Sequence, residues 1–180
     1  GVAEDAFVVV TASRLVYKNG VDTLIESLKF LPADFVLVIA GAGADEEKYK
    51  LLITNYQLQN KVIFTGMIGG KDKIAALQDS NVFVLPSYSE NFSMSAIEAM
   101  YFKLPVVITK YVGVAPEVEE YGAGIVTEKD TKEITEAITN ILANEKVKIA
   151  MGEAGNRLVK EKFEMSKIAD QWVKAYRSLP

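Results

Sequence analysis

The chain has 180 residues, of which 49% are hydrophobic and 24% are charged, and it contains neither histidine nor cysteine. These absences exclude disulfides, thiolate nucleophiles, Cys-ligated metal centres, Ser-His-Asp triads and HExxH zinc sites. With 20 Lys and Arg against 24 Asp and Glu, the net charge of −4 argues against a protein that coats nucleic acid. The length is that of one domain with its own core.

Six short apolar runs, rich in β-branched residues, predict strands that are buried on both faces. They span residues 7–11, 35–40, 62–66, 82–86, 105–109 and, more weakly, 124–126. Segments of helical period separate these runs, and the first of them is predicted to stop at Pro32. This alternation predicts a Rossmann-like, doubly wound parallel α/β sheet of about six strands.

Residues 130–177 have a different pattern, which predicts helices only and therefore a helical C-terminal tail. The last helix carries large apolar residues, among them Trp172, the one tryptophan of the chain. Such a face needs a surface to cover, either the core of this domain or a neighbouring domain. No apolar run approaches the roughly 20 residues of a membrane span, and we expect no signal peptide. We expect a soluble, cytoplasmic protein.

Ligands of open parallel sheets bind at the carboxyl ends of the strands, so the loops that leave the strands are the candidate sites. The first loop carries Arg14 and Lys18, which suit a cationic clamp for a diphosphate, although a solvated basic loop has the same composition. The second loop, Gly41-Ala42-Gly43, lacks the third glycine of GxGxxG and does not follow the first strand. It is interpreted as a tight turn, which weakens the case for an NAD-dependent dehydrogenase.

The third loop, residues 87–98, leads from the fourth strand into a helix. Ser93 is the predicted N-cap of that helix, whose unpaired N–H groups favour an anion. Glu90 precedes the cap, and Glu98 falls on the apolar stripe of the helix, where a carboxylate needs hydrogen-bond donors. The hydroxyls of a ribose would supply them; a purely structural carboxylate is the alternative. The fourth loop, residues 111–117, contains Pro116 at the expected start of a short helix, and its role is either binding or simple connection.

Glu90 and Glu98 stand in an E-x7-E spacing within Glu-Asn-Phe-Ser, Ile-Glu-Ala-Met and Leu-Pro-Val-Val. With Ser-Arg-Leu, Gly-Ala-Gly, Val-Ile-Phe-Thr-Gly and Gly-Val-Ala-Pro-Glu-Val, this ordered set resembles the C-terminal half of GT-B-fold retaining glycosyltransferases of family 4. These are transferases that use a nucleoside-diphosphate sugar as donor. The resemblance covers almost the whole chain.

The resemblance implies that Arg14 and Lys18 hold the donor diphosphate as it leaves and that Glu90 contacts the transferred sugar. It implies that Glu98 binds the ribose. Main-chain groups would reach the sugar and phosphate from Asn91, Phe92, Ser93 and Met94, and the base from Gly66, Met67 and Ile68. Transfer would retain the configuration of a hexosyl group and need neither cofactor nor metal.

Three positions depart from the family pattern. The usual lysine directly precedes Gly20, where this chain has Asn19, so the residue that takes its role, Lys18 or Asn19, is left open. Ser93 replaces the glycine that commonly follows the phenylalanine, and Lys103 replaces a glycine before Leu-Pro.

Members of this family resemble two Rossmann-like domains with a cleft between them. We therefore expect residues 1–180 to be a single donor-binding domain, inactive alone, with acceptor binding in an N-terminal domain absent from the chain. A sugar, polysaccharide or lipid acceptor, and any peripheral contact with the inner face of a membrane, would involve that missing half. No nucleic-acid partner is expected.

Two other classes remain as alternatives. A GT-B-like sugar-nucleotide epimerase would be expected to show another glutamate spacing and catalytic histidines. A non-catalytic, response-regulator-like binding module would carry an acidic cluster after the first strand, where this chain has Ser13-Arg14.

Overall fold

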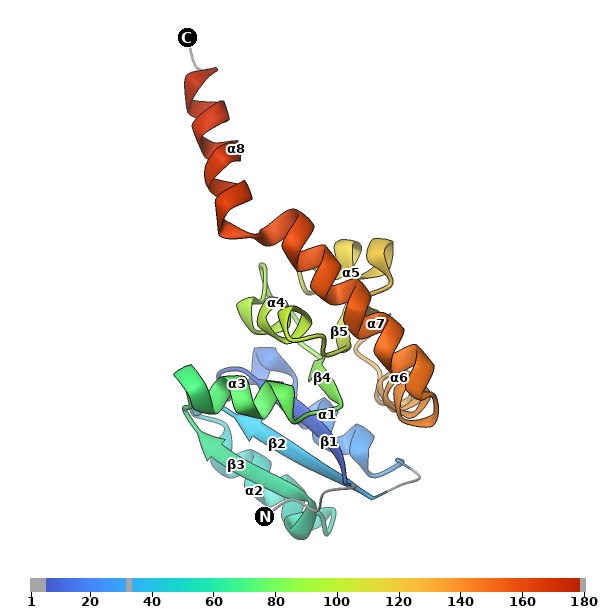
Figure 1. Cartoon of the computed structure of the whole chain (residues 1–180). Coiled ribbons are helices and arrows are strands. Elements are labelled where there is room, and N and C mark those ends of the chain that lie inside the picture. The colour runs from blue at the N-terminus through green and yellow to red at the C-terminus, as the bar shows by residue number, and fades with distance from the viewer. Residues whose placement is uncertain (1–5, 32–33, 179–180) are drawn as a thin grey trace.

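The computed structural model describes residues 6–31 and 34–178 (Figure 1). Within them, six strands form one parallel sheet in the order β3-β2-β1-β4-β5-β6. The strands are β1 (Phe7–Ala12), β2 (Phe35–Ala40), β3 (Val62–Gly66), β4 (Val82–Leu85), β5 (Val106–Thr109) and β6 (Gly124–Thr127). The six predicted strands are confirmed, each to within one residue at either end.

The connections between the strands are helical, as the alternating pattern predicts. The α-helices are α1 (Val21–Leu28), α2 (Glu46–Asn55), α3 (Gly70–Gln78), α4 (Met94–Tyr101), α5 (Ala115–Tyr121), α6 (Thr131–Ala143), α7 (Glu145–Leu158) and α8 (Met165–Arg177). Two short 3-10 turns, η1 (Tyr17–Asn19) and η2 (Gln59–Lys61), and a π-helical turn, η3 (Val159–Phe163), complete the backbone. The predicted stop at Pro32 lies outside the described residues, and α1 ends before it.

Helices cover both faces of the sheet because successive side chains of each strand point to opposite sides. Val9 joins the apolar cluster beneath α1, α2 and α6, whereas Val10 joins the cluster beneath α4, α5 and α7. Both side chains are fully buried. The order of the strands is that of a doubly wound Rossmann-like sheet, so the predicted fold class is confirmed.

The edge strands correct one expectation. β3 and β6 lie at the two edges of the sheet, and neither is buried on both faces. Ile63, the second residue of β3, keeps 40% of its surface exposed. An edge strand has a neighbour on one side only, so the helices that flank the sheet cover it less completely than the central strands.

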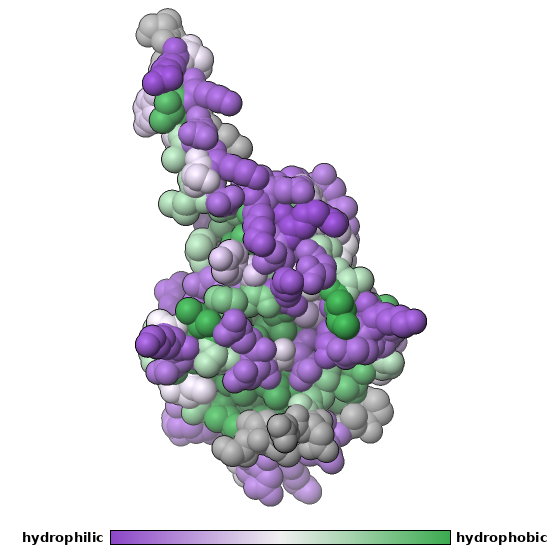
Figure 2. Space-filling model, viewed as in Figure 1, coloured by the Kyte–Doolittle hydropathy of each residue, from purple (hydrophilic) through white to green (hydrophobic). Residues whose placement is uncertain are grey.

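The C-terminal helix α8 projects from the body, as Figure 1 shows in red. η3 and the extended backbone of Glu164 end the preceding helix and redirect the chain. Trp172 and Tyr176 are 60% and 67% exposed, and the space-filling view shows α8 standing clear of the body (Figure 2). The sequence left two surfaces open for the apolar face of α8, the core of this domain or a neighbouring domain. In the structure this face does not cover the core of the domain. No helix in the described part of the chain is long and apolar enough to cross a membrane.

The direction of strand addition reverses between β1 and β4, which are neighbours in the sheet. β2 and β3 extend the sheet on one side of this pair, and β5 and β6 extend it on the other. Ligands of doubly wound folds bind at such a switch point, beyond the carboxyl ends of the strands. The loops after β1 and β4, which carry Arg14 and Glu90, lie at this point.

Candidate functional site

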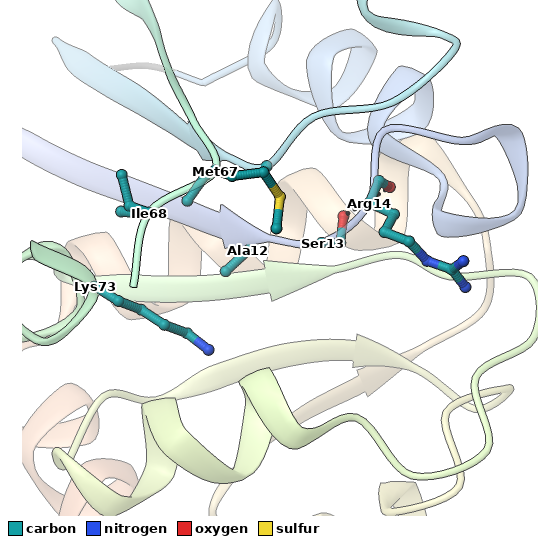
Figure 3. A pocket seen from close by; sticks show the side chains of 8 residues that line it. Ala12, Ser13, Arg14, Met67, Ile68 and Lys73 are labelled. Atoms are coloured by element: carbon teal, nitrogen blue, oxygen red, sulfur yellow. Dashed lines mark hydrogen bonds between the residues drawn. The ribbon is translucent and has the colours of Figure 1, made fainter. Parts of the chain in front are cut away.

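A cavity of about 200 Å³ opens at the carboxyl ends of β1, β2 and β3. It is lined by Ala12, Ser13, Arg14, Ala40, Gly41, Met67, Ile68 and Lys73. Figure 3 shows Arg14 and Lys73 at opposite ends of the pocket, with Met67 and Ala12 between them. The cavity therefore combines an apolar middle with a cation at each end.

Arg14 directly follows Ser13 at the end of β1, and its side chain is exposed to solvent. Among the described residues, no carboxylate lies within ion-pairing distance of its guanidinium. The loop itself is held from inside, because the buried amide of Asn19 donates a 2.7 Å hydrogen bond to the carbonyl of Arg14. A fixed backbone with an unpaired guanidinium suits the bidentate binding of an anion.

Lys18 is anchored through its own carbonyl oxygen. This oxygen accepts hydrogen bonds from the buried Ser87 hydroxyl, at 2.9 Å, and from the Tyr88 N–H, at 2.7 Å. The Lys18 ammonium lies 3.9 Å from the Glu90 carboxylate. Since Asn19 is buried against the backbone, the structure places Lys18 and not Asn19 beside Glu90.

Gly20 explains how the loops after β1 and β4 approach so closely. Its φ is +69°, a left-handed conformation that glycine adopts without steric cost, and a Cβ at this position would overlap the carbonyl oxygen of Pro86. The rings of Tyr17 and Tyr88 stack beside this contact, with centroids 4.7 Å apart. A hydrogen bond with the Tyr88 side chain raises the pKa of the Tyr17 hydroxyl. Neither aromatic side chain was expected at the site from the sequence.

The fourth loop supports the third. The Glu90 N–H donates to the carbonyl of Tyr111, at 3.1 Å, and the Gly113 N–H donates to the carbonyl of Glu90, at 2.8 Å. A Cβ on Gly113 would overlap the carbonyl oxygen of Asn91. The sequence left open whether the fourth loop binds or merely connects; in the structure it fixes the backbone on both sides of Glu90.

Ser93 caps α4 as predicted, since its hydroxyl accepts a 3.3 Å hydrogen bond from the Ala96 N–H. Its φ is +67°, which explains why glycine is usual at this position of the family motif and why serine there stores about 1–3 kcal/mol of backbone strain. Asn91, Phe92 and Met94 are exposed around it. Phe92 packs edge-on against Phe163 of η3, with ring centroids 5.2 Å apart.

Glu98 lies in the middle of α4 and pairs with Lys73, which reaches across from α3. The Oε2 atom of Glu98 has no appreciable exposed surface, whereas its side chain as a whole keeps 38%. The sequence predicts Glu98 on an apolar stripe of the helix, and in the structure its side chain is only partly buried. The sequence does not indicate Lys73. Residues 71–73, Lys-Asp-Lys, have the composition of an ordinary solvated helix start, and we find no sequence signal that singles out the third of them.

The structure thus places the predicted residues at the carboxyl ends of the strands. One group lines the cavity, and the other lies outside its lining. Arg14, Met67 and Ile68 line the cavity, while Gly66, in a left-handed conformation, ends β3 and accepts a hydrogen bond from Gly41 N–H. Glu90 and Lys18 form a pair outside the lining of the cavity. The segment from Asn91 to Met94 is also outside this lining.

A model of one protein family matches residues 1–158, and its description is "Glycosyl transferases group 1". The chain belongs to this family. The capsular polysaccharide biosynthesis glycosyltransferase CapM of Staphylococcus aureus is 28% identical over 183 residues, which cover 97% of this chain and 47% of CapM. The chain spans about half the length of the curated relatives that it matches.

Solved structures agree with this assignment. Anabaena Alr3699/HepE, in complex with UDP and glucose, has 25% sequence identity and a TM-score of 0.88, covering 97% of this chain and 49% of its own. The C-terminal domain of a group 1 family glycosyltransferase from Francisella tularensis, LpcC, has 25% identity and a TM-score of 0.76. That match covers 88% of this chain and 87% of the LpcC domain. The fold is therefore that of a C-terminal GT-B domain.

Proposed function

We propose that this chain is the donor-binding part of a retaining glycosyltransferase that transfers a hexosyl group from a nucleoside-diphosphate sugar. The observation that carries this proposal is the cavity at the carboxyl ends of β1, β2 and β3, which has the unpaired Arg14 at one end and Met67 and Ile68 in its lining. A nucleoside diphosphate has matching parts, since its diphosphate is anionic and its base is flat and largely apolar on its faces.

The cations of the loop after β1 match the negative charge that develops during the reaction. As the bond between the sugar and the diphosphate breaks, negative charge grows on the leaving oxygen. Arg14 and Lys18 would stabilise that charge without a metal ion, and one well-placed donor of this kind contributes about 3–4 kcal/mol to a transition state. The N-terminal end of α4, capped by Ser93, would add its N–H groups.

Glu90 would orient the sugar. Its carboxylate is half-buried and 3.9 Å from the Lys18 ammonium, so the two groups can hold a sugar hydroxyl and a phosphate oxygen side by side. A solvent-accessible ion pair at this distance contributes little free energy. Replacing the contact between Lys18 and Glu90 by contacts with the ligand therefore costs little free energy. For the configuration to be retained, the acceptor would have to attack the sugar from the same face from which the diphosphate leaves. The acceptor, and any lipid or membrane contact, would involve residues outside this chain.

Binding of nucleotides tests the proposal directly. UDP, GDP and ADP are titrated by calorimetry into the whole chain, into Arg14→Met and into Arg177→Met, whose arginine is exposed on α8. We expect at least one nucleotide to bind the unaltered chain. Arg14→Met should weaken it about 10- to 100-fold, the equivalent of a lost charge-assisted hydrogen bond, while Arg177→Met leaves affinity unchanged. If no nucleotide binds, or if Arg14→Met binds as well as Arg177→Met, the proposal is wrong.

A further inference from the structure

The ion pair between Lys73 and Glu98 crosses the candidate site from one helix to another. Lys73 lies in the first turn of α3 and lines the cavity, whereas Glu98 comes from α4 on the other side of the switch point. The two side chains are 28% and 38% exposed. The pair is therefore neither a surface contact nor part of the apolar core.

Lys73 is poorly placed for the stability of α3 itself. The first turn of a helix carries unpaired N–H groups and the positive end of the dipole, so a cation there is unfavourable by about 0.3–1 kcal/mol. Asp72 is an acidic residue within that first turn, and Glu98 adds a second carboxylate from outside the helix. Its Oε2 atom is buried, and the ion pair gives it Lys73 as a partner.

The ion pair leaves hydrogen-bonding sites free on both side chains. A carboxylate has two oxygens with about four acceptor sites, and an ammonium has three donors. When Oε2 faces Lys73, Oε1 retains its acceptor sites and the ammonium retains donors. Together they present an acceptor and a donor in one place. The vicinal hydroxyls of a ribose need this combination, because each hydroxyl both donates and accepts.

We propose that Lys73 is a positioning residue that fixes the Glu98 carboxylate and forms with it a pair that reads the ribose diol of the nucleotide. This inference rests on the proposed function, because it assigns Lys73 to the same donor site. It extends that function by naming a residue of the β3–α3 connection that makes the site selective for ribonucleotides. Without Lys73, the Glu98 side chain has no fixed partner and can turn away from the ligand.

The test compares ligands with and without the diol. The nucleoside diphosphate that binds most tightly among UDP, GDP and ADP is titrated beside its 2′,3′-dideoxy form. The variants are Lys73→Met, Glu98→Gln, the double variant and Lys71→Met, a matched control on the same turn of α3, exposed and outside the cavity lining. Thermal unfolding of each variant shows that it is folded.

We expect Lys73→Met to weaken the ribonucleotide about tenfold and to leave the dideoxynucleotide within twofold. The ratio of the two affinities should fall to the same value in Lys73→Met, Glu98→Gln and the double variant, while Lys71→Met and the conservative Lys73→Arg keep most of it. A merely structural role would weaken both ligands alike. If Lys73→Met leaves the ratio unchanged, or tightens ribonucleotide binding, the inference is overturned.

The two proposals fail separately. If the unaltered chain binds no nucleotide, the proposed function fails and the inference with it. If the unaltered chain binds the ribonucleotide better than its dideoxy form and Lys73→Met retains that preference, only the role of Lys73 is refuted.

Discussion

The two ends of the proposed nucleotide site are built differently. At the phosphate end, which comprises Arg14, Lys18 and Glu90, backbone segments from three loops touch each other, and Gly20 and Gly113 leave room for no side chain. At the nucleoside end, which comprises Met67, Ile68 and Lys73, a Cβ on Gly66, Gly69 or Gly70 would meet nothing within 4 Å. Met67 there is 75% exposed.

This difference separates two ways of making a site. The phosphate end depends on close backbone packing, so substitutions there should act on folding and binding together. The nucleoside end depends on long side chains that reach over open space, so substitutions there should act on ligand choice with little effect on folding. The Lys73 experiment tests the second statement, and three further predictions test the contrast.

The largest effect is expected at Gly20. Alanine at this position must adopt a φ of +69° and must displace the carbonyl of Pro86. Backbone strain and overpacking each cost about 1–3 kcal/mol, so Gly20→Ala should lose about 4 kcal/mol of unfolding free energy in urea. The comparison is Gly69→Ala at the nucleoside end, where φ is −149° and space is open. Gly69 is the N-cap of α3, where alanine is less favourable than glycine, so the loss should be no more than about 1 kcal/mol. Equal losses at both glycines would refute the contrast.

A smaller effect is expected at Ser87. Its buried hydroxyl donates to the carbonyl of Lys18, so Ser87→Ala removes one of the two hydrogen bonds that hold this oxygen. We expect a loss of about 1–2 kcal/mol of unfolding free energy together with weaker nucleotide binding. Thr65→Ala serves as the control, because the exposed Thr65 hydroxyl donates to the carbonyls of Ile39 in β2 and Gly66 in β3 and to no residue of the loops after β1 and β4. Nucleotide affinity that is unaffected by Ser87→Ala would show that the anchor of Lys18 is dispensable.

The smallest effect concerns Tyr49, which is buried in α2 and belongs to the same apolar cluster as Leu15. Its hydroxyl has no hydrogen-bond partner among the described residues, so Tyr49→Phe should be neutral or stabilise the fold by up to about 1 kcal/mol. Burial raises the pKa of Tyr49, so the unfolded chain loses this proton first, at pH values above about 10. Stability should therefore fall as the pH rises past that value, and less steeply in Tyr49→Phe.

Urea titrations between pH 8 and pH 11 measure this slope. Tyr176→Phe, on exposed α8, is the matched control and should keep the slope of the unaltered chain. A slope that is the same in both variants would show that Tyr49 does not contribute to it.

Much of the fold was predictable because it depends on short-range patterns. Short apolar runs rich in β-branched residues, such as residues 35–40, favour buried strands, and the helical segments between them favour crossovers to the next parallel strand. The same pattern did not distinguish edge strands from central ones. β3 begins with three apolar residues as a buried strand does, and only the order of the strands shows that it has a neighbour on one side alone.

The candidate site was predictable where it follows a motif along the chain. Arg14, Lys18, Glu90 and Glu98 stand at strand ends or in the E-x7-E spacing, and their positions in the sheet follow from the chain order. No motif along the chain indicates Tyr17, Tyr88 or Lys73. Each contributes through a partner on another segment, Tyr17 with Tyr88 and Lys73 with Glu98, and a contact between segments distant in sequence is invisible in either segment alone.

The amphipathic pattern of α8 shows the same limit. It predicted a helix with an apolar face carrying Trp172, and the helix is confirmed. It did not indicate the direction of the chain after η3, which carries that face away from the core (Figures 1 and 2).

The sequence by itself determined the class of fold and the family, and it indicated the loops that we propose hold a diphosphate and a sugar, because strands, helices and family motifs are properties of neighbouring residues. Only the tertiary structure decided that Lys18 and not Asn19 accompanies Glu90, that the fourth loop holds the third, and that Lys73 faces Glu98. These outcomes depend on which loops meet at the switch point between β1 and β4. Their physical basis is the packing of backbone and charge across segments far apart in the chain.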